Sequence, residues 1–229
     1  MKEVKIEMKN KKNLILGTSL LVLFILWTLL VSVLDVKSIG PRNSSVGFAS
    51  LNKWFHRLFG VSMTLYLITD WLGLIPVFIG VIFAIFGLVQ WIKRKSILKV
   101  DKNLLVLGVF YIIVMFVYVF FEMFVVNYRP ILIGGYLEAS YPSSTTMLVM
   151  CVMPTAMIQL YYRMKNSFLK KFLNIITSVF ISFMVIGRLL SGVHWLSDII
   201  GGVLFSLGIV LIYCSICKKM LLKEQGKDF

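Results

Sequence analysis

Charged residues are scarce in this sequence, and their scarcity narrows the class of protein at once. Only 15% of the 229 residues are charged, whereas 59% are hydrophobic and the mean hydropathy is +0.90. A water-soluble fold could not bury so much apolar surface, because soluble globular chains are about 45–50% apolar. The same abundance of aromatic and branched residues excludes a disordered chain. The composition therefore indicates an integral membrane protein.

Cysteine is almost missing, with three residues in the whole chain. Three are too few for a disulfide framework, which excludes a secreted disulfide-rich domain. Cys214 and Cys217 form a C-x-x-C pair at the end of an apolar run, and we interpret them as helix-packing residues rather than as a metal or redox pair. Because the chain has only two histidines and scattered carboxylates, we predict no metal site.

Six apolar runs are long enough to cross a bilayer, for which a helix needs about 20 residues. They are Leu14–Leu34, Leu72–Ile92, Leu104–Phe121, Met147–Tyr162, Phe172–Leu190 and Trp195–Ile216. The fourth run is short, and we expect its helix to start near Ser143. Residues 51–69 are apolar but interrupted by Lys53, His56 and Arg57, a mixture typical of an interfacial helix or of a lead-in to the second span. The sequence predicts an all-α integral membrane bundle of six transmembrane helices plus an interfacial helix, with seven spans as the alternative.

An excess of basic residues gives the chain a formal net charge of +14. On a soluble protein this charge would suggest a nucleic-acid partner, but here the basic residues lie between the apolar runs, as orientation signals do. With six spans, eighteen of the 24 Lys and Arg residues fall on the side of the two termini. The positive-inside rule therefore predicts that both termini are cytoplasmic, and we expect no nucleic-acid partner.

Three polar clusters lie where this topology places the outer ends of the spans. They are Glu122 with residues 127–130, residues 138–146, and Arg188 with His194 and Asp198. Ionisable residues near a membrane span are costly, so they are functional candidates by default. We therefore expect a site on the outer face of the membrane.

The residue types in these clusters suit phosphate chemistry. On a helix, His194 and Asp198 would share one face, since they are four residues apart. A carboxylate bonded to one imidazole nitrogen fixes the tautomer and leaves the other nitrogen as a base, nucleophile or ligand. Arg129 and Arg188 offer planar guanidinium groups that match phosphate oxygens. The alternative is an ordinary polar contact between His194 and Asp198 and two arginines that anchor the ends of spans.

A helix start is predicted after Pro142, where Ser143, Ser144 and Thr145 precede an apolar run. Free backbone N–H groups and hydroxyls at such a start can cradle an anion. We therefore predict that these three residues help to bind the substrate, although an ordinary helix cap would have the same sequence.

At these residues the sequence resembles the type-2 phosphatidic acid phosphatase superfamily of membrane lipid-phosphate phosphatases. The third motif of that family is Ser-Arg, five residues, His, three residues and Asp. Here Gly187 precedes Arg188, and His194 and Asp198 follow at the same spacing. The resemblance covers roughly residues 70–217 and suggests a bacterial source.

The first and second motifs of the family are altered in this sequence. The first is Lys, six residues, Arg and Pro, and Glu122 stands at the position of the Lys before Arg129. The second is Pro-Ser-Gly-His, and here it reads Pro-Ser-Ser-Thr and ends at Thr145. In the family, that histidine protonates the leaving group. Glu122 could substitute as the acid or pair with Asn127 or Arg129, and we interpret it as structural.

The resemblance implies a phosphohistidine mechanism that requires no metal or other cofactor. It implies His194 as the nucleophile, Asp198 as the residue that orients it, and Arg129, Arg188 and Ser143 as phosphate binders.

We predict a single membrane domain over residues 1–229. Residues 1–69 would form the N-terminal span and the interfacial segment, residues 70–217 a phosphatase-like core, and residues 218–229 a cytoplasmic tail. We expect a cell-membrane phosphatase that hydrolyses a lipid phosphate or diphosphate. Polyprenyl diphosphate is favoured, because a phosphate leaving group can depart without a proton. The alternative is a catalytically impaired homologue that binds or carries a phosphorylated lipid, and a channel or transporter ranks third.

Overall fold

Each predicted apolar run forms a helix, which satisfies its backbone hydrogen bonds internally, as a bilayer requires. The computed structural model describes residues 2–225, and six helical segments in this part of the chain are long and apolar enough to cross a membrane. These segments are Asn10–Val33, Met63–Arg94, Lys102–Met123, Ser144–Tyr161, Ser167–Leu190 and Leu196–Met220. The prediction of an all-α bundle with six spans is confirmed, and the alternative of seven is wrong. Residues 226–229 of the predicted tail lie outside the described residues.

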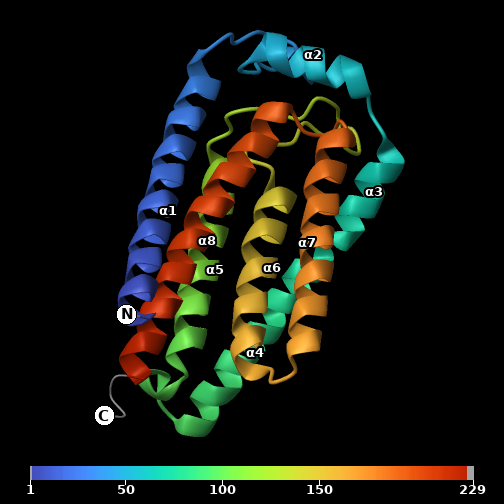
Figure 1. Ribbon diagram of the computed structural model, residues 1–229. Coiled ribbons are helices and arrows are strands. Elements are labelled where there is room, and N and C mark those ends of the chain that lie inside the picture. The colour runs from blue at the N-terminus through green and yellow to red at the C-terminus, as the bar shows by residue number, and fades with distance from the viewer. Residues whose placement is uncertain (1, 226–229) are drawn as a thin grey trace.

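The helices are α1 (Lys2–Val33), α2 (Ala49–Phe59), α3 (Met63–Leu72), α4 (Leu74–Arg94), α5 (Lys102–Met123), α6 (Ser144–Arg163), α7 (Ser167–Leu190) and α8 (Leu196–Gln225). Two 3₁₀ turns, η1 (Pro41–Asn43) and η2 (Ile97–Lys99), lie in the connections. Figure 1 shows that α1 begins and α8 ends at one end of the bundle, whereas α2 lies across the other end. The start of α6 at Ser144 agrees with the helix start predicted after Pro142.

The second span begins earlier than the predicted Leu72–Ile92, since α3 and α4 together form the apolar segment Met63–Arg94. Residues 51–69 are therefore divided between two elements, with α2 across the end of the bundle and α3 leading into α4 (Figure 1). Gly60 ends α2 with a φ of +66°. The Ser62 side chain then starts α3 by accepting a hydrogen bond from the backbone N–H of Leu65.

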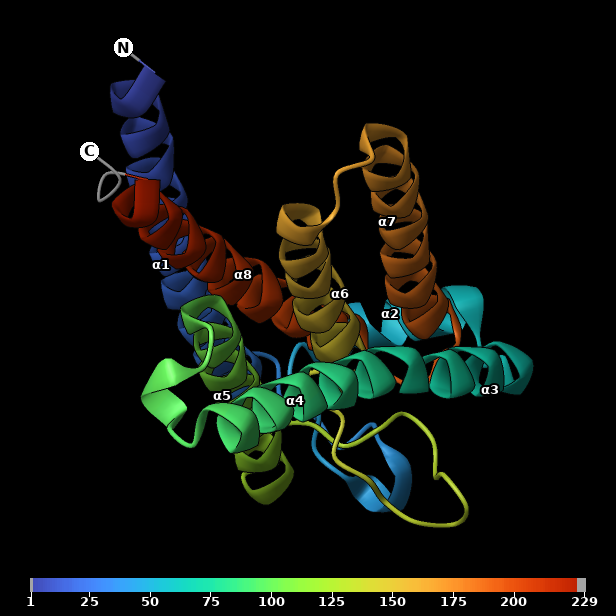
Figure 2. The same cartoon turned by 90° about the horizontal axis from the view of Figure 1, so that it is seen from below.

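The bundle is held together by contacts of α8 with α1 and α6, while α4 packs on α5 and α6 and α3 packs on α7. Figure 2 shows α3 and α4 running in line along one side of the bundle. Glycines allow α1 and α8 to approach closely: a Cβ at Gly17 would lie 2.8 Å from the carbonyl oxygen of Gly208. Small residues have this role at many membrane helix crossings. Cys217 is buried in the apolar core, consistent with its interpretation as a packing residue.

Candidate active site

The third polar cluster lies where α7 ends and α8 begins, at the end of the bundle that α2 covers (Figure 1). Arg188 is in the last turn of α7, and His194 lies in the connection to α8. Gly192 in this connection has a φ of +69°, and a Cβ there would lie 2.0 Å from the carbonyl oxygen of Gly60. Only glycine tolerates both the angle and the approach. The connection that carries His194 is thus held against the link between α2 and α3.

The imidazole of His194 is held in one tautomer. Its Nδ1 lies 3.1 Å from the carbonyl oxygen of Ser140 and 3.0 Å from the hydroxyl oxygen of the same residue. A carbonyl oxygen only accepts hydrogen bonds, so Nδ1 carries the proton and Nε2 carries the lone pair. The side chain is 3% exposed, and within residues 2–225 its Nε2 has no hydrogen-bond partner. Such a nitrogen can act as a nucleophile or a base.

The spacing predicted that His194 and Asp198 share one helix face. In the structure, Asp198 instead contacts His194 through the Ser140 side chain. The hydroxyl of Ser140 donates to Oδ2 of Asp198 at 2.5 Å and lies 3.0 Å from Nδ1 of His194. The reason is local: α8 begins at Leu196, so His194 precedes the helix and the rule for residues four apart does not apply. Ser140 therefore links the carboxylate to the imidazole.

The carboxylate of Asp198 is fully buried and surrounded by donors. Its Oδ2 also accepts from the backbone N–H of Trp195 at 2.9 Å. Its Oδ1 accepts from Nδ2 of Asn127 at 3.0 Å and from the hydroxyl of Ser197 at 3.3 Å. Every one of these groups donates a hydrogen bond to the carboxylate, so its position is fixed. Asp198 can thus stabilise positive charge on the imidazole through the Ser140 hydroxyl.

Helix α2 supports this network from above. Its Asn52 is fully buried, donates to the hydroxyl of Ser197 at 2.9 Å and accepts from the backbone N–H of the same residue at 3.1 Å. His56, predicted as an interfacial residue, is half-buried, with its Nε2 at 3.2 Å from the carbonyl oxygen of Gly192. Sequence reasoning missed Asn52. The only signal was an amide side chain in an otherwise amphipathic segment, and its partner is 145 positions away.

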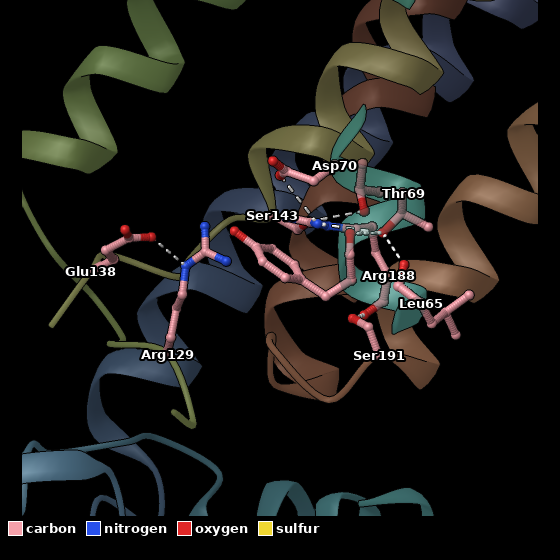
Figure 3. A network of polar contacts seen from close by, with 10 residues as sticks. Leu65, Thr69, Asp70, Arg129, Glu138, Ser143, Arg188 and Ser191 are labelled. Atoms are coloured by element: carbon pink, nitrogen blue, oxygen red, sulfur yellow. Dashed lines mark hydrogen bonds and ion pairs between the residues drawn. The ribbon is translucent and has the colours of Figure 1, made fainter. Parts of the chain in front are cut away.

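Arg188 is surrounded by side chains from α3, which the sequence did not place in the site. Its guanidinium carbon lies 5.1 Å from the centre of the Tyr66 ring. Its Nη1 lies 3.4 Å from the hydroxyl oxygen of Thr69 and 3.5 Å from Oδ1 of Asp70 (Figure 3). Its Nε is buried without a hydrogen-bond partner in the described part of the chain. A Cβ at Gly187, where the family has Ser, would lie 2.8 Å from Cγ2 of Thr69, so glycine makes room for α3.

Arg129 lies across from Arg188, beside Glu138 (Figure 3). Its Nε is 3.1 Å from Oε2 of Glu138, and its side chain is 11% exposed. The backbone N–H of Arg129 donates to the carbonyl oxygen of Glu138, and the N–H of Ser140 donates to that of Asn127. This short antiparallel pairing joins the first and second polar clusters. Nη1 of Arg129 is buried and, among the residues described, finds no hydrogen-bond partner, so it remains available to an anion.

The residues predicted at the start of α6 are placed differently from one another. Ser143 is fully buried, and its N–H donates to the carbonyl oxygen of Asp198 at 3.1 Å, so this amide is already occupied. Ser144 lines a small cavity together with His194. Thr145 instead packs at the joint of α3 and α4, where a Cβ on Gly73 would lie 3.3 Å from its Cγ2. Ser144 is thus the one of the three whose side chain borders the imidazole pocket.

Glu122 forms part of the wall of the same cavity. The partners suggested for it, Asn127 and Arg129, bind Asp198 and Glu138 instead. The cavity has a volume of about 10 Å³, which is room for one water molecule and not for a phosphate group. The cavity beside His194 is therefore closed to a phosphate group in this structure. Within the described residues, no three His, Cys, Asp or Glu side chains are grouped so as to hold a metal ion.

Comparison with known proteins shows the family to which the chain belongs. The family model of the PAP2 superfamily matches residues 77–220, and the chain belongs to this superfamily. The chain is also similar to the solved structure of a transmembrane PAP2-type phosphatidylglycerolphosphate phosphatase from Bacillus subtilis, with a TM-score of 0.58 and 20% sequence identity over 87% of this chain and 93% of that chain. No curated protein matches the chain. The predicted family is confirmed, over nearly the predicted range.

Proposed function

We propose that the protein is a membrane phosphatase that hydrolyses a lipid phosphate or diphosphate through a phosphohistidine on His194. The observation that carries this proposal is the buried Nε2 of His194, which has no partner within residues 2–225 and whose proton is held on the opposite nitrogen. Membership of the PAP2 superfamily supports the reaction class. Two buried guanidinium groups beside the imidazole support a phosphate substrate.

The first step is attack by Nε2 of His194 on phosphorus. The N–P bond forms as the bond from phosphorus to the leaving oxygen breaks, and the leaving group takes that electron pair. Arg129 and Arg188 stabilise the charge on the remaining phosphoryl oxygens, which is the main task of a phosphoryl-transfer site. Nδ1–H stays bonded to Ser140, and Asp198 stabilises the positive imidazole. Water then attacks phosphorus, the N–P bond breaks, and inorganic phosphate leaves.

The nature of the leaving group favours a diphosphate substrate. A phosphate monoester expels an alkoxide, whose conjugate acid has a pKa of about 16, like that of water. A diphosphate expels a phosphate group, whose second pKa is about 6, and this group can leave without a proton. Because Thr145 stands where the family has its acidic histidine, we infer that a polyprenyl diphosphate is the preferred substrate.

We infer that the site lies on the outer face of the membrane and that both termini lie in the cytoplasm. The excess of basic residues on the side of the termini supports this orientation. The beginning of α1 and the end of α8 lie together, opposite α2 and the site (Figure 1).

Thiol labelling tests this orientation. In a background without the native cysteines, Cys at Lys99 or Lys165 is expected to resist an impermeant thiol reagent in intact cells. Cys at Tyr136, which is 74% exposed near the site, is expected to react. Labelling at Lys99 and Lys165 but not at Tyr136 would invert the topology and place the site in the cytoplasm.

The pH dependence of the reaction follows from the surroundings of His194. Burial, followed by the positive charges of Arg129 and Arg188, holds the pKa of His194 well below its ordinary value of 6.5. The neutral imidazole is the nucleophile and persists above that lowered pKa. We therefore expect kcat/KM, corrected for ionisation of the substrate, to stay level as the pH falls through 6.5 and to decline only in more acidic solution. A decline centred at or above 6.5 would contradict this arrangement.

The Ser140 hydroxyl is expected to contribute to the rate as a link between His194 and Asp198. Ser140→Ala should lower kcat by about 10- to 100-fold, the effect of losing a hydrogen bond to a charged group. The loss is limited because the Ser140 carbonyl still holds Nδ1–H. Ser206→Ala is the matched control, since Ser206 is also buried and does not line the cavity at His194. Equal rates for the two variants would remove Ser140 from the mechanism.

Phosphate release tests the proposed function itself. The purified protein in detergent micelles is incubated with a polyprenyl diphosphate, a polyprenyl monophosphate and dioleoyl phosphatidic acid, and inorganic phosphate is measured. We expect turnover of at least one lipid, with the diphosphate fastest. Binding of these lipids without any release of phosphate would favour the non-catalytic binder, to which the altered first and second motifs also point.

A further inference from the structure

Two larger cavities lie beyond the small cavity at His194, along the membrane-spanning helices. The first has a volume of about 460 Å³ and shares Tyr118 and Ser144 with the walls of the small cavity. The second has a volume of about 640 Å³ and shares Ala84, Tyr111 and Met115 with the walls of the first. Because each cavity shares wall residues with the next, the three lie one after another along α4 and α5. We call the two larger cavities the α4–α5 groove, after the helices that supply most of its walls.

The α4–α5 groove is apolar almost throughout. Its upper part is lined by side chains such as Val77, Val114 and Met147, and its lower part by side chains such as Leu104 and Ile112. Apolar walls favour a hydrocarbon occupant. The small cavity next to the upper part is lined by a polar side chain that is 97% buried, since His194 is 3% exposed and its Nε2 has no partner in the described chain. The groove therefore offers a place for a hydrocarbon next to a place for a phosphate.

Three glycines widen this groove instead of bringing helices together. A Cβ at Gly80 would have its nearest neighbour at 4.0 Å, one at Gly87 at 3.7 Å, and one at Gly108 would have nothing within 4 Å. By contrast, a Cβ at Gly17 between α1 and α8 would lie 2.8 Å from backbone. Glycine lowers helix stability relative to other residues, and close packing does not require it at these three positions. The space that the three glycines leave is open to a ligand.

The length of the groove distinguishes between kinds of lipid tail. On α5 its wall extends from Tyr118 to Leu104, which is about 21 Å at 1.5 Å per residue. Half of the hydrocarbon core of a bilayer is only about 15 Å. An acyl chain of a glycerolipid occupies one leaflet, so it would fill the upper part and leave the lower part empty.

We propose that the α4–α5 groove binds the hydrocarbon tail of the substrate as one chain that passes the middle of the bilayer, with the phosphate group at His194. A long polyprenyl chain has this form, and a pair of acyl chains does not. The inference rests on the proposed function, because it takes the ligand at His194 to be the substrate. It adds that contacts of the tail with α4 and α5 make binding depend on the length of the tail.

Filling the groove at two depths tests the proposal. Gly108→Leu adds a side chain to the lower part, and Gly80→Leu adds one to the upper part. Gly108→Leu is expected to raise KM for undecaprenyl diphosphate by about tenfold, through the loss of about two buried methylene contacts. It should leave KM for farnesyl diphosphate within a factor of about two, because the shorter chain ends in the upper part. Gly80→Leu should raise KM for both substrates. Ser19→Leu, on the exposed face of α1, is the control and should change neither.

The outcomes separate this proposal from the proposed function. Gly108→Leu could change KM equally for the two chain lengths, or change neither while the wild type is active. Either result would contradict binding of the tail in the α4–α5 groove. An equal rise in KM for dioleoyl phosphatidic acid would show that diacyl tails reach the lower part and would overturn the single-chain assignment. Gly87→Leu repeats the test of the lower part, and thermal unfolding of each variant in detergent shows whether it is folded.

A binding measurement tests the groove even if the protein releases no phosphate. An undecaprenyl diphosphate with a photoreactive group at the far end of its chain is irradiated with the wild-type protein in micelles. Crosslinks are expected in residues 97–112, which line the lower part, and should be lost when unlabelled undecaprenyl diphosphate is added. Crosslinks confined to α1 or α7 would overturn the groove. Crosslinks in the groove without any release of phosphate would contradict the proposed phosphatase activity but not the binding of the tail in the groove.

Discussion

Replacing His194 with Ala is expected to lower kcat for lipid phosphate hydrolysis by about 10⁴- to 10⁶-fold, the effect of removing a nucleophile or its base from an enzyme. The variant loses the nitrogen that forms the bond to phosphorus, and no neighbouring side chain in the described site replaces it. Ser140 and Ser144 border the same cavity, but a serine hydroxyl that lacks a histidine base is a weak nucleophile.

His56→Ala is the matched control, since it removes the other histidine of the chain. His56 contacts the backbone of Gly192 and does not line the cavity that His194 shares with Glu122 and Ser144. We expect this control to lose far less activity. Both variants should insert in the membrane and unfold at temperatures close to that of the wild type. Activity of His194→Ala near that of the wild type would exclude the phosphohistidine mechanism.

The second large effect is expected at Thr145, where the family has the histidine that protonates the leaving group. Thr145→His should raise the rate on a lipid monophosphate by up to about 10²-fold, the lower range of general acid catalysis. It should change the rate on the matching diphosphate far less, because a phosphate leaves without a proton. The ratio of the two rates, measured for each variant with the same polyprenyl tail, reports this difference directly.

Thr145→Gln is the control for size, since it adds a comparable side chain that cannot donate a proton as an acid. Thr145 packs against the joint at Gly73, so both substitutions disturb α3 and α4 to a similar degree. A similar ratio for the Gln and His variants would remove the acid from the explanation. A wild type that cleaves phosphatidic acid as fast as polyprenyl diphosphate would contradict the inferred preference.

The apolar runs were sufficient to predict six spans because hydropathy and length decide which segments can cross a bilayer. The beginning of the second span was placed too late. Residues 51–69 mix aromatic and charged side chains, and only the break at Gly60 and the cap at Ser62 divide them into α2 and α3. A local signal for this break exists in the sequence, but hydropathy does not register it.

The site was predicted in outline, since the polar clusters at the span ends contain His194, Arg129 and Arg188. The connections within it were not predictable from spacing. His194 and Asp198 are joined by Ser140, which is 54 positions from the histidine. Such contacts depend on how the connections fold over the bundle, and the sequence periodicity carries no information on them.

Helix α3 is a second part of the site that the sequence did not predict. Tyr66, Thr69 and Asp70 surround the guanidinium of Arg188, although the sequence assigned residues 51–69 to an interfacial segment. The Asp70 carboxylate lies 3.5 Å from Nη1 of Arg188. A substrate phosphate that binds Arg188 would approach the same guanidinium group. A polar Thr–Asp pair within an apolar run was the available signal, because intramembrane ionisable residues are costly.

Trapping the phosphoenzyme tests the central claim most directly. Wild-type protein is mixed with a polyprenyl diphosphate labelled in its terminal phosphate, denatured within the first turnover in alkali, and digested for mass spectrometry. We expect an acid-labile phosphoryl group on His194 in the wild type and none in His194→Ala. Release of labelled phosphate without any labelled protein, or a label on another residue, would contradict it.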